Sequence, residues 1–274
     1  MPAVKIVRQR MEQNGLFYLA AILIALAVKH HYSQAGAGDL GWILTPTANM
    51  VSLVTGDGFR FEAGAGYVCD TQRIIIAPAC AGVNFMLMAF GMSVFAGVHH
   101  MKGRRHRFGW LMFSLAASYG LALLVNTLRI VISIHTYHAD FSTGSLPWAW
   151  VHRLEGVVIY FFFLYLFYSM IRGIIKRYTK NEPGRGPAPN MENQDRNSAI
   201  RKALFAGLIP CAWYLSVTLA VPFLNGAPSK AGGRFYEHAA MVLGLCLTTW
   251  ICIAAVTRCG RKVRLLFNRR SPET

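Results

Sequence analysis

The feature that most constrains this chain of 274 residues is a series of apolar stretches separated by short polar segments. Each is close to the roughly 20 residues that an α-helix needs to cross the hydrocarbon core of a bilayer. Only 15% of the residues are charged, well below the ~25% typical of soluble domains. We expect six spans, at about 15–32, 80–98, 110–130, 152–172, 203–224 and 239–257. The sequence therefore predicts an all-α polytopic membrane protein.

Basic residues predict the orientation of these spans. With a cytoplasmic N-terminus, 21 of the 28 Lys and Arg residues fall in segments on the cytoplasmic side, which is the positive-inside pattern. We expect both termini in the cytoplasm and the first span to be retained rather than cleaved as a signal peptide. An anionic inner leaflet explains the net charge of +16 better than nucleic acid does, so membrane lipids are expected partners and nucleic acid is not.

The segment between the first and second spans has two parts. Residues 33–54 are too short and too interrupted by Gly and Pro to cross the membrane, and are expected to form a helix at the outer interface. From 56 to 78, β-branched and aromatic residues cluster around glycines, which predicts a small β-hairpin-like segment outside the membrane.

A segment rich in Pro, Asn and charge divides the chain. Residues 179–198 are expected to be a cytoplasmic linker. It separates a catalytic module of four spans, 1–178, from a C-terminal appendage of two spans, 199–274.

Two of the six cysteines, Cys69 and Cys80, are expected on the outer side of the membrane. Pro78 disfavours helix at the preceding residue, which leaves Cys80 at or near the first turn of the second span. Free backbone N–H groups and the positive end of the dipole at a helix N-terminus stabilise a thiolate, the reactive form of cysteine. Cys80 is therefore a candidate nucleophile.

Arg129 closes the third span, in NTLRI, and Asn126 lies three residues before it on the same helical face. A lone arginine at this position is commonly an interfacial anchor. A functional role gains weight because Arg129 has to meet the end of the neighbouring span that carries Cys80.

His152 opens the fourth span, in HRLEG, and Gly156 follows one turn later, where a helix or a substrate backbone can approach closely. His135 and His138 are rival candidates for a base, since both lie just beyond the third span. We prefer His152, because its depth is fixed by the start of a span.

Consecutive spans run in opposite directions, so the start of the second, the end of the third and the start of the fourth lie at one membrane face. A thiol, a permanent cation and an imidazole at that face can act as nucleophile, oxyanion stabiliser and proton carrier.

The motifs PACAGVNF, NTLRI and HRLEG together resemble the signature of the exosortase/archaeosortase family. Its pattern is a Cys followed by a small residue and Gly, then Asn-x-x-Arg, then His-x-x-x-Gly. The matching residues here are Cys80 and Gly82, Asn126 and Arg129, and His152 and Gly156, with Ala81 where the family commonly has Ser. The resemblance covers about 15–175 and does not reach the last two spans.

The resemblance implies a membrane cysteine protease or transpeptidase of a prokaryotic cytoplasmic (inner) membrane, with its active site on the extracytoplasmic side. Its partners would be exported proteins that carry a C-terminal sorting motif, a transmembrane helix and a basic tail. Cys80 would form a thioester, Arg129 would stabilise the oxyanion and His152 would act as acid and base, with no cofactor and no metal. Two alternatives stay open: a thiol–disulfide oxidoreductase using Cys69 and Cys80, and a non-enzymatic transporter or scaffold.

Overall fold

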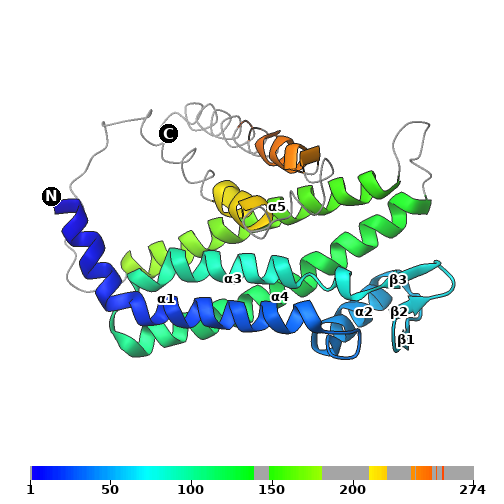
Figure 1. The fold of residues 1–274 in the computed structure, drawn as a ribbon, viewed down its shortest axis with the longest axis horizontal. Coiled ribbons are helices and arrows are strands. Elements are labelled where there is room, and N and C mark those ends of the chain that lie inside the picture. Colours follow the sequence, from blue (N-terminus) through cyan, green and yellow to red (C-terminus); the bar gives the residue numbers. More distant parts are fainter. Residues whose placement is uncertain are drawn as a thin grey trace, which may run out of the picture. The chain divides into compact units, whose positions relative to one another are not determined.

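Helices dominate the structure, a computed structural model, as the apolar stretches predict (Figure 1). It describes residues 2–138, 148–180, 210–220, 236–237, 239–248, 251 and 255. Two units are distinguished, Met1–Pro183 and Gly184–Thr274. In the described residues, four helices are long and apolar enough to cross a membrane: Asn14–Gln34, Pro78–His100, Gly103–Tyr137 and Val151–Thr179. These match the first four expected spans.

The last two expected spans, 203–224 and 239–257, lie largely outside the described residues. In the second unit, Ser216–Ala220 forms a short π-helix and Ala239–Thr248 a short apolar helix. Six spans are therefore not established.

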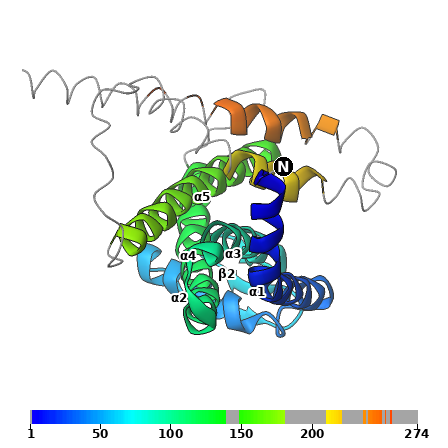
Figure 2. The ribbon, with the colours of Figure 1, turned by 90° about the vertical axis from the view of Figure 1, so that its left-hand side faces the viewer.

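The helix α3 (Val83–Gly97) lies at the centre of the first unit, with other helices around it (Figure 2). It packs against α1 (Pro2–Gln34), α4 (Gly103–His138) and α5 (Trp148–Lys180). Most of the α3 side chains are buried, which accounts for its uniformly apolar sequence, because a helix surrounded by other helices has no polar face.

Close contact between α3 and α4 is possible because Gly97 has no side chain. A Cβ atom there would lie 2.3 Å from the indole ring of Trp110, which also donates a hydrogen bond to the carbonyl of Ser93 at 3.1 Å. The hydroxyls of Ser93 and Ser114 are 2.9 Å apart. Small residues of this kind let membrane helices approach closely.

The segment expected to lie at the membrane interface is a helix, α2 (Gly41–Thr55), and its buried side packs against α4. Pro46 lies inside this helix and removes the N–H that would bond the carbonyl of Trp42. The hydroxyl of Tyr119 on α4 donates to that carbonyl instead, at 2.7 Å. The carbonyl of Trp42, which Pro46 leaves without its helical partner, thus joins α2 to α4 by a hydrogen bond.

The expected hairpin is a sheet of three antiparallel strands: β1 (Arg60–Glu62), β2 (Gly66–Cys69) and β3 (Ile74–Ile76), in the order β1-β2-β3. The prediction of two strands was incomplete, because a second turn at 70–73 returns the chain to pair with β2. Asp57 holds this turn by accepting hydrogen bonds from Thr71 at 3.0 Å and Gln72 at 2.8 Å.

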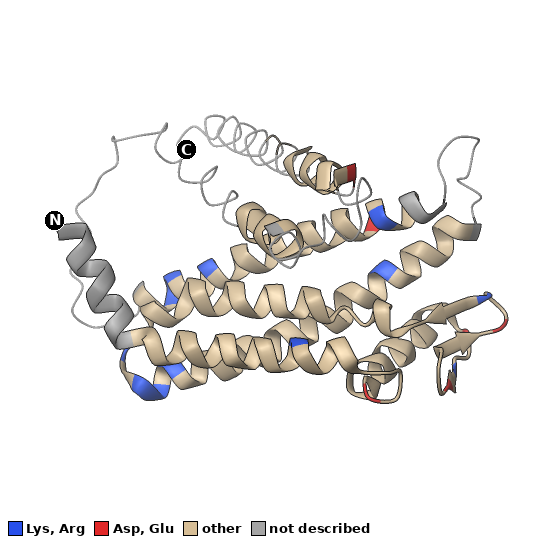
Figure 3. Ribbon diagram, viewed as in Figure 1, with Lys and Arg blue, Asp and Glu red and all other residues tan. Residues whose placement is uncertain are grey.

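Charge is distributed unevenly along the described part of the first unit (Figure 3). Lys and Arg gather at the end where η2 (Val98–His100) leads into α4, whereas Asp and Glu lie in the opposite half, around the sheet and on α5, among scattered basic residues. The orientation predicted from basic residues would place the sheet and the ends of α4 and α5 nearest to it outside the cytoplasm.

Candidate active site

Cys80 lies in a short 3-10 turn, η1 (Pro78–Cys80), between β3 and α3. Its backbone N–H is bonded to the carbonyl of Ala77 at 2.8 Å, and α3 begins only at Val83. The sequence placed Cys80 at or near the first turn of the span. In the structure the residue precedes the helix, because the left-handed backbone of Gly82 (φ 72°) separates the turn from α3. Cys80 is half-buried and its thiol is free.

The side chain of Asn126 packs closely against the backbone of Gly82. A Cβ atom on Gly82 would lie 3.2 Å from the Cγ atom of Asn126, and the positive φ would strain any other residue. Asn126 is fully buried and donates a hydrogen bond from Nδ2 to the carbonyl of Cys80. The third span therefore holds the backbone of the candidate nucleophile in place.

α1 also contacts this turn and the start of α3. The hydroxyl of Tyr32 lies 3.4 Å from the carbonyl oxygen of Pro78, and Lys29 donates to Asn84, near the start of α3, at 2.7 Å. Both α1 and α4 thus contact the segment that carries Cys80.

Arg129 and Asn126 are joined through Tyr160 on α5, which the sequence reading did not identify. Arg129 donates from Nη1 to the Tyr160 hydroxyl at 2.8 Å, and this hydroxyl donates to Oδ1 of Asn126 at 3.0 Å. The guanidinium also lies over the Tyr160 ring, 5.4 Å from its centroid, and this ring stacks on Phe85 with the two centroids 4.7 Å apart.

Both ring nitrogens of His152 have partners on α4. Nε2 lies 3.0 Å from Nη2 of Arg129, and Nδ1 lies 2.8 Å from the hydroxyl of Ser133. Arginine can only donate, so Nε2 has to be the acceptor and is unprotonated. A neutral His152 then carries its proton on Nδ1 and donates it to Ser133.

Gly156 faces the side chain of Arg129. A Cβ atom at this glycine would lie 3.6 Å from Nε of Arg129, and that nitrogen is buried without a hydrogen-bond partner among the described residues. From the sequence we expected a helix or a substrate backbone to approach closely at Gly156. In the structure, the side chain next to this glycine is that of Arg129.

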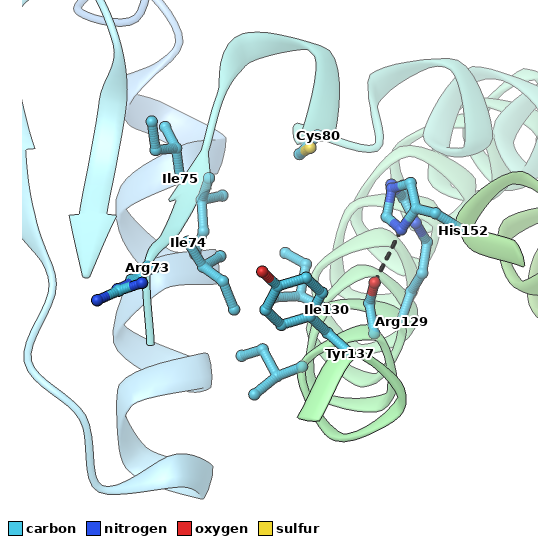
Figure 4. Close-up of a pocket in the computed structure, with 11 residues that line it drawn as sticks. Arg73, Ile74, Ile75, Cys80, Arg129, Ile130, Tyr137 and His152 are labelled. Carbon is cyan, nitrogen blue, oxygen red and sulfur yellow. Dashed lines mark hydrogen bonds between the residues drawn. The ribbon is translucent and has the colours of Figure 1, made fainter. Parts of the chain in front are cut away.

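Cys80, Arg129 and His152 line one pocket of about 290 Å³ (Figure 4). Residues of β3 and α4 also line this pocket. Five of the lining residues are isoleucines: Ile74, Ile75, Ile76, Ile130 and Ile134. The pocket thus combines a thiol, a cation and an imidazole with a mostly apolar wall.

Two of the rival residues, His135 and Cys69, do not line this pocket. His135 is exposed, and its Nδ1 lies 2.8 Å from the carbonyl oxygen of Val131 on its own helix. The side chain of His138 lies outside the described residues. Cys69 is fully buried in β2 as a free thiol, with its sulfur 3.1 Å from the Thr71 hydroxyl, so it forms no bridge with Cys80.

The two partners that the sequence reading missed, Tyr160 and Ser133, both carried a positional signal. Tyr160 follows Gly156 by one helical turn and His152 by two, and Ser133 follows Arg129 by one turn. Residues at these spacings share a helical face with the candidate residues. Tyrosine and serine are common in membrane helices, so this signal becomes specific only once the helices are packed.

Comparison with known proteins identifies one family. Residues 54–169 match the sequence model of the transmembrane exosortases. This range contains the sheet, the Cys80 turn, α3, α4 and the part of α5 that carries His152 and Tyr160. Neither the curated proteins nor the solved structures gave a match.

Proposed function

We propose that this chain, which belongs to the transmembrane exosortase family, is a cysteine transpeptidase that cleaves the C-terminal sorting tails of exported proteins. The family match supports a membrane enzyme of the transpeptidase type that acts in protein sorting. The observation that carries the finer proposal is the lining of one pocket by Cys80, Arg129 and His152.

In the first step, the thiolate of Cys80 attacks the scissile carbonyl and forms a C–S bond. The negative charge that develops on the carbonyl oxygen is stabilised by the guanidinium of Arg129. The C–N bond then breaks, and the departing amine of the tail takes a proton from His152. A thioester on Cys80 results.

The contact between Arg129 and His152 implies an exchange of partners. Nε2 of His152 accepts from Arg129 in the structure, so it is not free to accept a proton from the thiol. When a substrate carbonyl binds, Nη2 of Arg129 can turn to the carbonyl oxygen, and this releases Nε2 as a base. The same movement would supply the oxyanion contact and the proton acceptor together.

In the second step, His152 removes a proton from the acceptor, which attacks the thioester and restores the thiol. Water gives hydrolysis, and a nucleophilic group on a lipid or glycan gives transfer. Ser133 keeps the imidazole oriented through both steps by its contact with Nδ1.

A substrate held by its own transmembrane helix meets the enzyme in the plane of the membrane. Such positioning replaces a three-dimensional search and can supply several kcal/mol of barrier reduction, within the roughly 7–11 kcal/mol available from full preorganisation. The proposal places the pocket on the extracytoplasmic side of a prokaryotic inner membrane, with both termini in the cytoplasm, and the complete chemical site in residues 1–178.

The test compares host cells that carry the wild-type protein with cells that carry Cys80→Ala. Mass spectrometry of membrane fractions should find exported proteins that retain a C-terminal tail only in the variant strain. Brief treatment of wild-type membranes with neutral hydroxylamine should release acyl groups from Cys80 as hydroxamates, because thioesters are cleaved by this reagent. Equal tail processing in both strains would exclude the proposal. Cys69→Ser is the matched control, since it removes a thiol that lies outside the pocket.

A further inference from the structure

Among the described residues, the sheet ends in a strand, β3, whose outer edge pairs with no other strand. In the order β1-β2-β3, the strand β3 pairs with β2 on one side only. A strand at a sheet edge presents backbone N–H and C=O groups that can pair with another extended chain.

The direction of the backbone groups of β3 follows from its contact with Gly66. A Cβ atom on Gly66 of β2 would come within 2.3 Å of the carbonyl oxygen of Ile76, so this oxygen faces β2. The N–H and C=O of consecutive residues in a strand point to alternate sides. Ile74 and Ile76 therefore direct their backbone groups to β2, and Ile75 directs its groups away from the sheet.

The free edge lies at the candidate active site. All three residues of β3 line the pocket that contains Cys80, and Ile75 is 51% exposed. Within the described residues, Ile75 has no hydrogen bond outside the sheet. In Figure 4, Cys80 lies between β3 and His152, and Ile130 and Tyr137 lie across from the strand. An extended chain placed along β3 would thus run toward the thiol.

We propose that the part of the substrate next to its scissile bond binds as an added strand along β3, with its backbone paired to the N–H and C=O of Ile75. This proposal rests on the proposed function and specifies how that site takes its substrate. The occupant is an extended peptide segment. Backbone pairing of this kind gives affinity without reading sequence, and the pockets beside the strand then select side chains. Ile130, Ile134 and Tyr137 would favour an apolar side chain close to the scissile bond.

The test uses two variants of one residue. Ile75→Pro removes the outward N–H and places a ring at the free edge, while the ladder between β2 and β3 keeps its hydrogen bonds. Ile75→Ala keeps the N–H and removes most of the side chain. In pulse-chase experiments on a protein whose tail is retained in the Cys80→Ala strain, Ile75→Pro should slow tail removal by about tenfold or more. Ile75→Ala should slow it by no more than about threefold.

A measurement on the unaltered enzyme covers the case in which Ile75→Pro does not fold. Proline is placed at successive positions before the scissile bond of the same substrate. Strand addition predicts losses at alternate positions, because only alternate residues of the added strand direct their N–H to β3. Losses that do not alternate, or equal effects of Ile75→Pro and Ile75→Ala in folded protein, would overturn the proposal. If Cys80→Ala itself left tail removal intact, the proposed function would fail instead.

Discussion

Removing the hydroxyl of Tyr160 tests how the candidate active site is held together. Tyr160→Phe keeps the ring that stacks on Phe85 and lies under Arg129, and removes only the oxygen. This oxygen accepts from Arg129 at 2.8 Å and donates to Asn126 at 3.0 Å. The variant therefore breaks the link between the candidate oxyanion stabiliser and the residue that holds the Cys80 carbonyl.

The size of the effect follows from the two partners left behind. Each buried polar group without a partner costs about 1–3 kcal/mol. Some of this cost is offset if water or a shifted side chain takes the place of the hydroxyl. We therefore expect Tyr160→Phe to lower the free energy of unfolding by about 2–4 kcal/mol. Processing should slow by about 10- to 100-fold, because a misplaced Arg129 stabilises the oxyanion less well.

The assay is pulse-chase measurement of tail removal, with the amount of folded protein and the rate of Cys80 alkylation measured in the same membranes. Tyr168→Phe is the matched control. It removes the hydroxyl of a mostly buried tyrosine on the same helix, and no hydrogen bond joins that hydroxyl to another described residue. Tyr168→Phe should process substrate at close to the wild-type rate.

A double variant separates positioning from general destabilisation. If Tyr160 acts through Asn126, then Tyr160→Phe combined with Asn126→Ala should cost less than the sum of the single variants, by about 0.5–3 kcal/mol. Additive losses would mean that the two residues act independently. A wild-type rate of processing in Tyr160→Phe would refute the inference that this hydroxyl positions the site.

Other predictions concern single contacts and the division of the chain. Ser133→Ala should slow processing by about tenfold or less, because it removes one neutral hydrogen bond to His152, and a pulse-chase measurement equal to wild type would contradict the orienting role. Gly82→Ala should lower stability by at least about 1–2 kcal/mol through its left-handed backbone, which thermal unfolding in detergent would detect. Cys69→Ser should process substrate almost normally, since Cys69 lies buried outside the pocket, and loss of activity at normal protein levels would favour redox chemistry. Co-expressed halves separated near Gly186 should retain tail removal if the first unit holds the whole chemical site, and failure of two stably inserted halves would contradict that division.

Much of the architecture was predictable because it depends on local sequence. The length and apolarity of each stretch predict where helices cross the bilayer, and the first four spans are found where they were expected. Alternation of direction between spans also placed Cys80, Arg129 and His152 at one end of the helices. The motifs that predicted the family lie within the range that matches it. The order of the spans along the chain and the thickness of the membrane therefore allow few alternative positions for these residues.

The contacts within the site were decided only by tertiary packing. How far each helix is rotated about its axis, and how closely it approaches its neighbours, depends on side chains distant in sequence, such as Trp110 against Gly97. That packing brought Tyr160 between Arg129 and Asn126, and directed His152 to Arg129 and Ser133. The third strand likewise depends on a turn and a pairing partner, and neither is encoded in the residues of β3 themselves. The sequence by itself determined which reactive residues share one end of the bundle, and the fold decided which of their atoms meet.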